Sequence, residues 1–310
     1  MDSCLENIVK TLQAYENDIK LQPGFLKKFK GQKPLSEHQQ KNIIFSGSGD
    51  SLASAMLAES FSNLRVKCVD PLDLLKNKSL VKNKTVYFVS ISGNTISNIK
   101  VAKAAKKAIA ITSRPGSRLA KSSDSTIILS STNSDVFTAG SISFLESALT
   151  CISLVCPIHI QKSEVIFKKA YSDAKNSKIT QRIFVLGNML TFPVAMYCAA
   201  KFYEILGADA HFEHIEQFSH MELFSANKGD TVIIFEEKNS HNKQLVQNLK
   251  NVGMNVIHPT FDSKNKVSQT IYYAFFSQLL TLFEAKKRHK KDCHFVLSKN
   301  LRNVSDKMIY

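Results

Sequence analysis

Short apolar runs alternate with helical stretches along most of the chain, and this alternation limits the possible folds more than any other feature. Residues 43–45, 85–89 and 108–112 are almost entirely apolar. Strands of a parallel sheet are covered on both faces, so they read as continuous apolar runs. Helices of about ten to fifteen residues between such runs are typical of a parallel sheet with crossover connections. The sequence therefore predicts an α/β fold.

The alternation runs through the chain twice, which predicts two α/β units in tandem. Strands are expected at residues 43–45, 66–69, 85–89, 108–112 and 126–129, then at 183–186, 231–235 and 255–258. Helices are expected at residues 5–19, 52–61, 96–107, 142–160, about 163–175, 191–206, 243–252 and 268–286. A polar connection is expected at 22–41, an irregular stretch at 208–220 and a polar tail at 294–310. We expect residues 1–165 to hold an N-terminal helix and the first unit. Residues 166–310 would hold the second unit, a C-terminal helix and the tail.

Positive charge dominates the composition. The chain carries 41 Lys and Arg against 26 Asp and Glu, a formal surplus of 15. Such a surplus attracts anionic molecules. The basic clusters at residues 27–33 and 286–291 lack the interleaved aromatic pattern of a base-stacking platform, and the chain has no Trp. We therefore expect solvated basic faces and a phosphorylated small molecule as ligand, and no nucleic acid partner.

Neither a membrane segment nor a cysteine framework is visible in the sequence. Residues 194–200 form one of the longest apolar runs, whereas a membrane span needs about 20 residues. The first fifteen residues include Asp2 and Glu6 and no apolar leader. None of the six cysteines has C-x-x-C spacing, which argues against a zinc cluster or a redox dithiol. We expect a cytoplasmic protein with reduced thiols and no membrane partner.

Two loops rich in Ser and Gly directly follow expected strands. The first reads Gly47-Ser48-Gly49-Asp50-Ser51 and the second reads Ser90-Ile91-Ser92-Gly93-Asn94-Thr95. In parallel sheets ligands bind beyond the carboxyl ends of the strands, so both loops are expected at one site. Hydroxyls and the N–H groups of a helix N-terminus suit a phosphate dianion. Alternatively, Ser90 and Thr95 only cap a helix.

The second of these loops resembles the phosphosugar-binding loop of sugar isomerase (SIS) domains, S-x-S-G-x-T. The turn Gly49-Asp50-Ser51 is similar to the G-x-S turn on the first strand of that domain. The resemblance implies a flavodoxin-like α/β/α sandwich for each unit, so the expected architecture is two tandem SIS-type units. It also implies a sugar phosphate bound by the two loops, through Gly49, Ser51, Ser90, Ser92, Asn94 and Thr95.

The second half of the chain contains a Glu and a His that suit aldose–ketose isomerisation. Glu204 ends a helix as Lys201-x-x-Glu204, and His220 follows sixteen residues later. Isomerisation needs one group that opens the sugar ring and a carboxylate that moves a proton between C1 and C2. Both residue types can be tuned toward neutral pH. From the residues alone, Glu204 could instead be solvated and His220 structural.

The K-x-x-E helix end and the later His are similar to those of double-SIS isomerases, a group that includes archaeal phosphoglucose/phosphomannose isomerases and the isomerase half of glucosamine-6-phosphate synthase. The resemblance implies that Glu204 is the C1/C2 base and His220 the ring-opening residue, supplied across a homodimer interface. It implies no metal and no cofactor. Glu216 departs from the pattern, because it precedes His220 by four residues and not three.

Two further stretches affect the expected substrate, and a third raises the question of a metal. The Pro-Arg pair of the phosphoglucose/phosphomannose type is missing from residues 135–141. Asn303 stands where aminosugar-forming members carry a Lys, although Lys299 and Lys307 lie close by in the sequence. The string His211-x-Glu213-His214 could bind a metal, but we expect these side chains to line the same cleft or the dimer interface.

The sequence thus predicts a phosphosugar-binding aldose–ketose isomerase that acts on a hexose 6-phosphate or its amino derivative through ring opening and an enediol. Two alternatives stay open. One is a deaminase or deglycase of a sugar-phosphate amine. The other is a non-catalytic phosphosugar sensor, which would have no need of the Glu204 and His220 pair.

Overall fold

The first unit is built on a five-stranded parallel sheet. The computed structural model describes residues 10–131, 136–160 and 162–309. Within them the first sheet has the strand order β2-β1-β3-β4-β5. All of its pairs are parallel, and β1 pairs with β3 from Ile43↔Thr85 to Gly47↔Val89. The strands are β1 (Ile43–Gly47), β2 (Lys67–Cys68), β3 (Thr85–Val89), β4 (Lys107–Thr112) and β5 (Ser125–Ile128).

The second unit repeats this plan with four parallel strands. Its order is β7-β6-β8-β9, so β6 occupies the place that β1 has in the first sheet. The strands are β6 (Ile183–Gly187), β7 (Ala210–Glu213), β8 (Thr231–Phe235) and β9 (Asn255–Ile257). Two tandem parallel-sheet α/β units are therefore confirmed as the fold, whereas a domain boundary after residue 165 stays a prediction.

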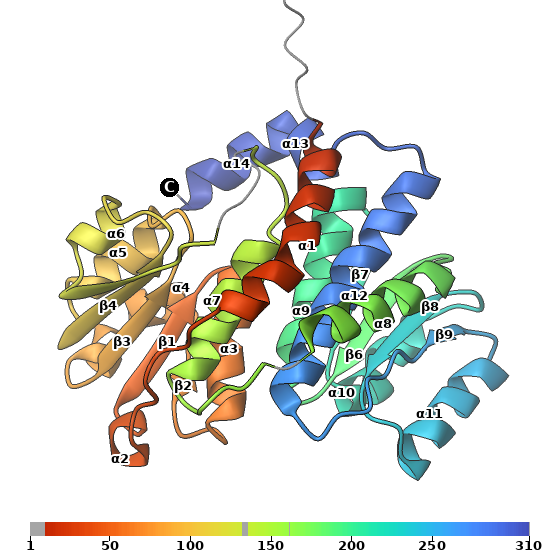
Figure 1. The fold of residues 1–310 in the computed structure, drawn as a ribbon, viewed down its shortest axis with the longest axis horizontal. Helices are drawn as coiled ribbons and strands as arrows, with labels where there is room; N and C mark the ends of the chain where they lie inside the picture. Colours follow the sequence, from red (N-terminus) through yellow and green to blue (C-terminus); the bar gives the residue numbers. More distant parts are fainter. Residues whose placement is uncertain (1–9, 132–135, 161, 310) are drawn as a thin grey trace, which may run out of the picture.

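Helices fill the space between the two sheets and cover their outer faces (Figure 1). The inner layer is α1 (Thr11–Lys28), α3 (Asp50–Phe61), α7 (Ile142–Ser153), α8 (Ser163–Asn176), α9 (Phe192–Lys201) and α12 (Lys266–Lys287). The outer face of the first sheet carries α4 (Pro71–Lys76), α5 (Ile96–Ala102) and α6 (Arg118–Lys121), and that of the second carries α10 (Ile215–His220) and α11 (Ser240–Asn251). The remaining elements are α2 (Glu37–Gln40), η1 (Lys78–Val81), η2 (Phe202–Leu206), η3 (Glu222–Ser225), α13 (His294–Leu297) and α14 (Lys299–Ile309).

The largest core cluster joins both units through α12, which is apolar on nearly all sides. Ile271, Phe275 and Phe276 are fully buried within it. A helix that is apolar all round has to be covered all round, and α12 packs on α8, α9 and α1. The Gln22 amide donates to the Gln278 side-chain oxygen at 2.7 Å, which ties α1 to α12 inside this core.

Several expected elements differ from the observed ones. The N-terminal helix reaches Lys28 and not residue 19, because Leu26 is also buried; residues 5–9 of the expected helix lie outside the described residues. The helix expected at 142–160 ends at Ser153, shortly before Pro157, which cannot continue a helix. The helix expected at 96–107 ends at Ala102, because β4 begins at Lys107.

The stretch expected to be irregular contains an element that its composition concealed. Residues 210–213 form the edge strand β7, with only Ala210 buried, which is why its sequence is rich in His and Glu. The tail expected to be polar and mixed forms α13 and α14. Leu301, Val304 and Met308 on α14 are exposed, so no core pattern marked this helix.

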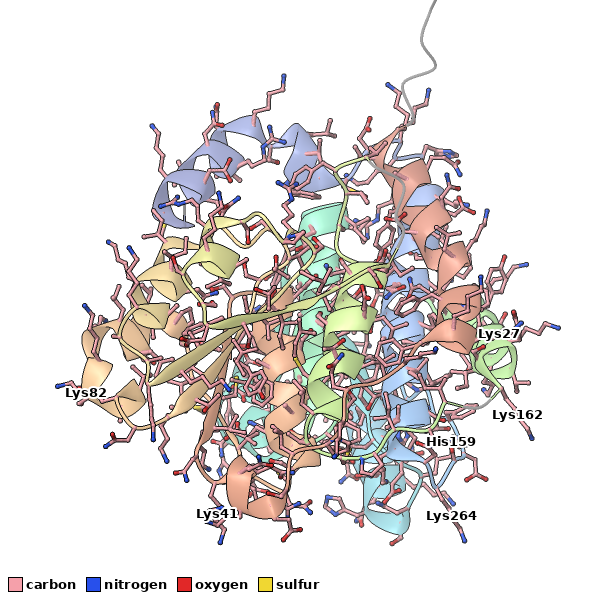
Figure 2. All side chains as sticks on the ribbon, turned by 60° about the vertical axis from the view of Figure 1, so that its left-hand side comes forward. Lys27, Lys41, Lys82, His159, Lys162 and Lys264 are labelled. Atoms are coloured by element: carbon pink, nitrogen blue, oxygen red, sulfur yellow. The ribbon has the colours of Figure 1, made fainter. Side chains whose placement is uncertain are left out.

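Lysine side chains surround the molecule rather than forming one face. Figure 2 shows the labelled side chains of Lys27, Lys41, Lys82, Lys162 and Lys264 at the periphery; the first lies on α1 and the other four in separate connecting segments. This distribution agrees with basic residues that mainly meet solvent. Across the described ranges, no helix combines the length and apolarity needed to cross a membrane.

Candidate functional site

A cavity of about 580 Å³ lies at the carboxyl end of the first sheet, where β1, β3 and β4 end. Two of its walls are the Ser/Gly loops. Gly49 has φ +58°, and Gly93 has φ +63° with Ser117 Oγ only 2.1 Å from where a Cβ would lie. Glycine is therefore required for the second loop to fold back. The polar lining consists of Asp18, Ser48, Asp50, Ser51, Ser90, Ser92, Thr95, Ser113, Arg114, Thr138, Ser143 and Ser147.

The structure brings most of the predicted phosphate-binding residues to this cavity. Gly49, Ser51, Ser90, Ser92 and Thr95 all line it. Asn94 instead lines a neighbouring hollow, with Arg114 and Arg118. The capping alternative for Thr95 does not fit the structure, because Thr95 precedes α5 without a side-chain bond to the helix. The Ser90 hydroxyl accepts the Gly93 N–H at 3.2 Å, so it shapes the loop.

Ser113 and Arg114 are among the lining residues that the sequence analysis missed. They directly follow β4, the strand next to β3. Their place after a central parallel strand was the available signal, because every such strand ends at the same edge. Arg114 adds a cation to a cavity whose hydroxyls and helix N-termini favour an anion, while Asp18 and Asp50 add carboxylates to the same lining.

A buried ion-pair network joins this cavity to the second unit. Lys201 on α9 is fully buried, and its Nζ lies 2.7 Å from Asp50 Oδ2 on α3. The same ammonium bonds the Glu204 carboxylate and lies 4.8 Å from the centre of the Tyr197 ring. Burial disfavours the charged amine, but the two carboxylates outweigh it and hold the pKa of Lys201 above its ordinary value.

Glu204 lies on a single π-helical turn, Phe202–Leu206, that follows α9. Such turns are rare and are frequent at functional sites. Although 33% of its side-chain surface stays exposed, burial raises the pKa of Glu204 to about 7; Lys201 opposes this rise and Asp50 adds to it. A carboxyl group that titrates near neutral pH can accept and return a proton under physiological conditions.

His220 lies apart from this network within a single chain. It ends α10, its side chain is 70% exposed, and its ring faces Glu216 at 3.3 Å. It is not among the residues that line the cavity. The pairing of His220 with Glu204 therefore stays a prediction that requires a second copy of the chain.

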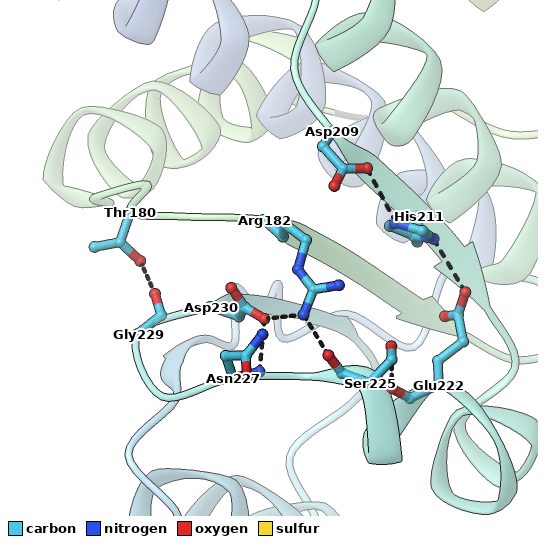
Figure 3. Close-up of polar contacts among 9 residues, drawn as sticks. All are labelled: Thr180, Arg182, Asp209, His211, Glu222, Ser225, Asn227, Gly229 and Asp230. Atoms are coloured by element: carbon cyan, nitrogen blue, oxygen red, sulfur yellow. Dashed lines mark hydrogen bonds and ion pairs between the residues drawn. The ribbon is translucent and has the colours of Figure 1, made fainter.

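The His211, Glu213 and His214 side chains have different partners, and none of them lines the cavity; the Glu213 carboxylate accepts the His214 N–H. His211 contacts Asp209 and Glu222, each at 3.1 Å, beside the Arg182–Asp230 ion pair (Figure 3). His214 stacks on Phe192 with ring centres 3.8 Å apart. Within the described part of the chain, no three His, Cys, Asp or Glu side chains converge as metal ligands would.

The lysines of the tail are also separate from the network. Lys299 and Lys307 are exposed residues of α14. The tail approaches the rim of the cavity elsewhere, since the Arg302 guanidinium lies 6.0 Å from the ring of Phe137, which lines the cavity.

Several solved structures with this fold are named as enzymes of phosphorylated sugars. Glucosamine-6-phosphate deaminase from Thermotoga maritima aligns with a TM-score of 0.75 and 19% identity, over 91% of this chain and 95% of its own. The C-terminal domain of glucosamine-fructose-6-phosphate aminotransferase from Francisella tularensis aligns at 0.63 and 16%, over 92% and 98%. Tagatose-6-phosphate ketose/aldose isomerase from Escherichia coli aligns at 0.65 and 16%, over 89% and 94%.

Because these sequence identities are low, the comparisons show that the proteins share a fold and nothing finer. No family model and no curated protein matches the sequence. The chain is thus similar, over nearly its whole length, to phosphosugar isomerases and deaminases built from two parallel-sheet units.

Proposed function

We propose that this protein is a phosphosugar isomerase that interconverts an aldose phosphate and a ketose phosphate. The observation that carries the proposal is the ion-pair network, because it connects a hydroxyl-lined cavity to a carboxylate with a pKa of about 7. A phosphosugar sensor would need the cavity alone.

The phosphate group binds between the two loops. Hydroxyls of Ser51, Ser90, Ser92 and Thr95 donate hydrogen bonds to its oxygens, and the N-termini of α3 and α5 favour its negative charge. Arg114 adds a charge-assisted contact at the rim. The sugar then extends from the phosphate toward Asp50 and the second unit.

Glu204 takes the proton from C2 of the open-chain aldose and returns it to C1 through an enediol, while the proton of the C2 hydroxyl passes to the oxygen on C1. Its raised pKa suits this role, since a base with a pKa near the working pH both accepts and releases the proton readily. His220 of a second copy opens the ring, a role that suits its exposure in a single chain. The active form is accordingly a homodimer.

A coupled assay with fructose 6-phosphate and related ketose phosphates, with and without ammonia, tests this function. Formation of an aldose phosphate without ammonia is the expected result. Product that appears only with ammonia would favour the deaminase class, to which the Thermotoga maritima enzyme of the same fold belongs. Binding without turnover of any sugar phosphate would favour a sensor.

Complementation tests the shared site. Glu204→Gln and His220→Ala variants are each expected to lose turnover. Mixed subunits should recover roughly a quarter of the wild-type rate, because half of the dimers are mixed and each has one intact site. Light scattering that shows only monomers at micromolar concentration would contradict the shared site.

A further inference from the structure

Asp50 belongs to the first loop of the cavity and is connected to the candidate base through Lys201, and its environment sets it apart from other acidic residues. It is the first residue of α3, it lines the cavity, and 21% of its side-chain surface is exposed. Its Oδ2 accepts a hydrogen bond from the Lys201 ammonium at 2.7 Å. Its Oδ1 is buried and has no hydrogen-bond partner in the part of the chain that the structure describes.

The surrounding chain leaves room for this carboxylate. A Cβ on Gly140 would lie 2.5 Å from Asp50 Oδ2, so a larger residue at that position would displace the ion pair. The Tyr197 hydroxyl donates to the Gly140 carbonyl at 2.8 Å and fixes this segment. A buried carboxylate with one free oxygen costs folding free energy, so packing alone gives no reason to place it here.

We propose that Asp50 is a positioning residue for the candidate base: it anchors the Lys201 ammonium, and Lys201 in turn holds the Glu204 carboxylate where the two units meet. The inference deepens the proposed function, because it assigns a role to a residue of that site. A fully buried ammonium needs charged partners. Asp50 supplies one from the first unit, while Glu204, three residues after Lys201, supplies the other.

Five titratable groups interact electrostatically with the Glu204 carboxylate. Lys201 favours its charged form and Asp50 opposes it. Tyr15 on α1, Tyr197 on α9 and Cys293 before α13 also lie in its field, and all three have pKa values raised chiefly by burial, so they stay neutral near pH 7. Asp50 and Lys201 are therefore the two charges that set its titration.

Two variants should move this titration in opposite directions. In Asp50→Asn a negative charge disappears, so the pKa of Glu204 should fall below the wild-type value of about 7. In Lys201→Met a positive charge disappears, so the pKa should rise. The measurement is the carboxyl 13C shift of glutamate-labelled protein against pH, with the Glu204 signal identified by its loss in Glu204→Gln.

A second readout tests the anchoring directly. Lys201 is fully buried and should resist an amine-reactive acetylating reagent in the folded wild type. Asp50→Asn releases one of its two partners, so acetylation of Lys201 should become at least several-fold faster by mass spectrometry. Asp73→Asn, which changes an exposed acid on α4 of the same unit, is the matched control and should change neither measurement.

Unchanged titration and unchanged protection in folded Asp50→Asn would overturn the inference. If Asp50→Asn fails to fold, Lys201→Met decides instead, and a Glu204 midpoint that does not rise there would also overturn it. Neither readout requires turnover. A protein that shows both shifts yet converts no sugar phosphate would refute the proposed function and leave the anchoring intact.

Discussion

The loop after β1 lines a cavity in the first unit, whereas the equivalent loop after β6 in the second unit is closed. Gly47 and Gly187 end β1 and β6, and in each case a Cβ would clash with the backbone four residues later. Gly49 and Met189 both have positive φ, at +58° and +45°. The two loops therefore share one backbone path, although their sequences differ.

The two units differ in the residue that follows the neighbouring strand and lies beside this loop. Ser90 follows Val89, the partner of Gly47, whereas Glu236 follows Phe235, the partner of Gly187. The Glu236 carboxylate accepts the Asn188 N–H at 3.1 Å and the Thr191 hydroxyl at 3.0 Å. A fixed carboxylate thus closes the loop of the second unit, whereas the equivalent loop of the first unit lines a cavity. One backbone path therefore borders the proposed ligand site in one unit and a closed support in the other.

The largest expected effect separates the catalytic contribution of the second unit from the binding contribution of the first. Glu204→Gln should lower turnover by roughly 10²–10⁴-fold, because an amide cannot accept the proton, while binding of the sugar phosphate persists. Wild-type turnover should increase as pH passes about 7, where the carboxyl group loses its proton. Steady-state kinetics and calorimetry measure the two contributions.

Lys299→Ala and Lys307→Ala serve as controls for this variant and should keep wild-type turnover. Borohydride added with substrate should trap no adduct on either lysine, because the proton transfer needs no imine. A trapped adduct would instead assign the protein to the amine-handling branch.

A smaller effect is expected from removing hydroxyls of the open loop. A phosphorylated sugar should stabilise the wild type against heat by roughly 2.7 kcal/mol at 100 times the dissociation constant, and the free sugar should not. Ser92→Ala combined with Thr95→Ala should abolish this difference. Thr191→Ala, in the closed loop, should keep it. Equal shifts for fructose and fructose 6-phosphate would contradict a phosphate site.

The smallest effect concerns the carboxylate that closes the second loop. Glu236→Ala removes an acceptor shared by the Asn188 N–H and the Thr191 hydroxyl, which also bond each other's residues at 2.9 Å. It should therefore cost about 0.5–1.5 kcal/mol of unfolding free energy, whereas Glu236→Gln keeps an acceptor and should cost less. Burial raises the pKa of Glu236, so the folded state binds this proton more tightly than the unfolded state. Its contribution to stability therefore declines as pH rises from the ordinary Glu value through the folded one.

Urea denaturation at several pH values checks this expectation. The pH-dependent decline should be smaller in Glu236→Gln, and the exposed neighbour Glu237 offers the matched control, Glu237→Gln. An identical pH dependence in wild type and Glu236→Gln would show that the buried carboxylate does not titrate as described.

Local patterns were enough to predict the parallel sheets, because buried strands such as β3 keep an unbroken apolar run. They also placed Ser51 and Ser90 at one sheet edge. The Asp50–Lys201 contact could not be predicted, since the two residues are 151 positions apart and no local pattern marks a buried Lys. The π turn around Glu204 was equally hidden, because an amphipathic pattern does not distinguish it from α-helix.

The position of α12 has a consequence for synthesis on the ribosome. This helix fills the centre of the core between both units, and the segment after it pairs with the start of α1: Leu12 N–H donates to the Lys291 carbonyl, and Thr11 N–H donates to the Asp292 carboxylate. The helices that α12 covers emerge long before it does. Until residues 266–293 leave the exit tunnel, a nascent chain exposes the apolar sides of α1, α8 and α9, and such surfaces are sites for chaperone binding and aggregation.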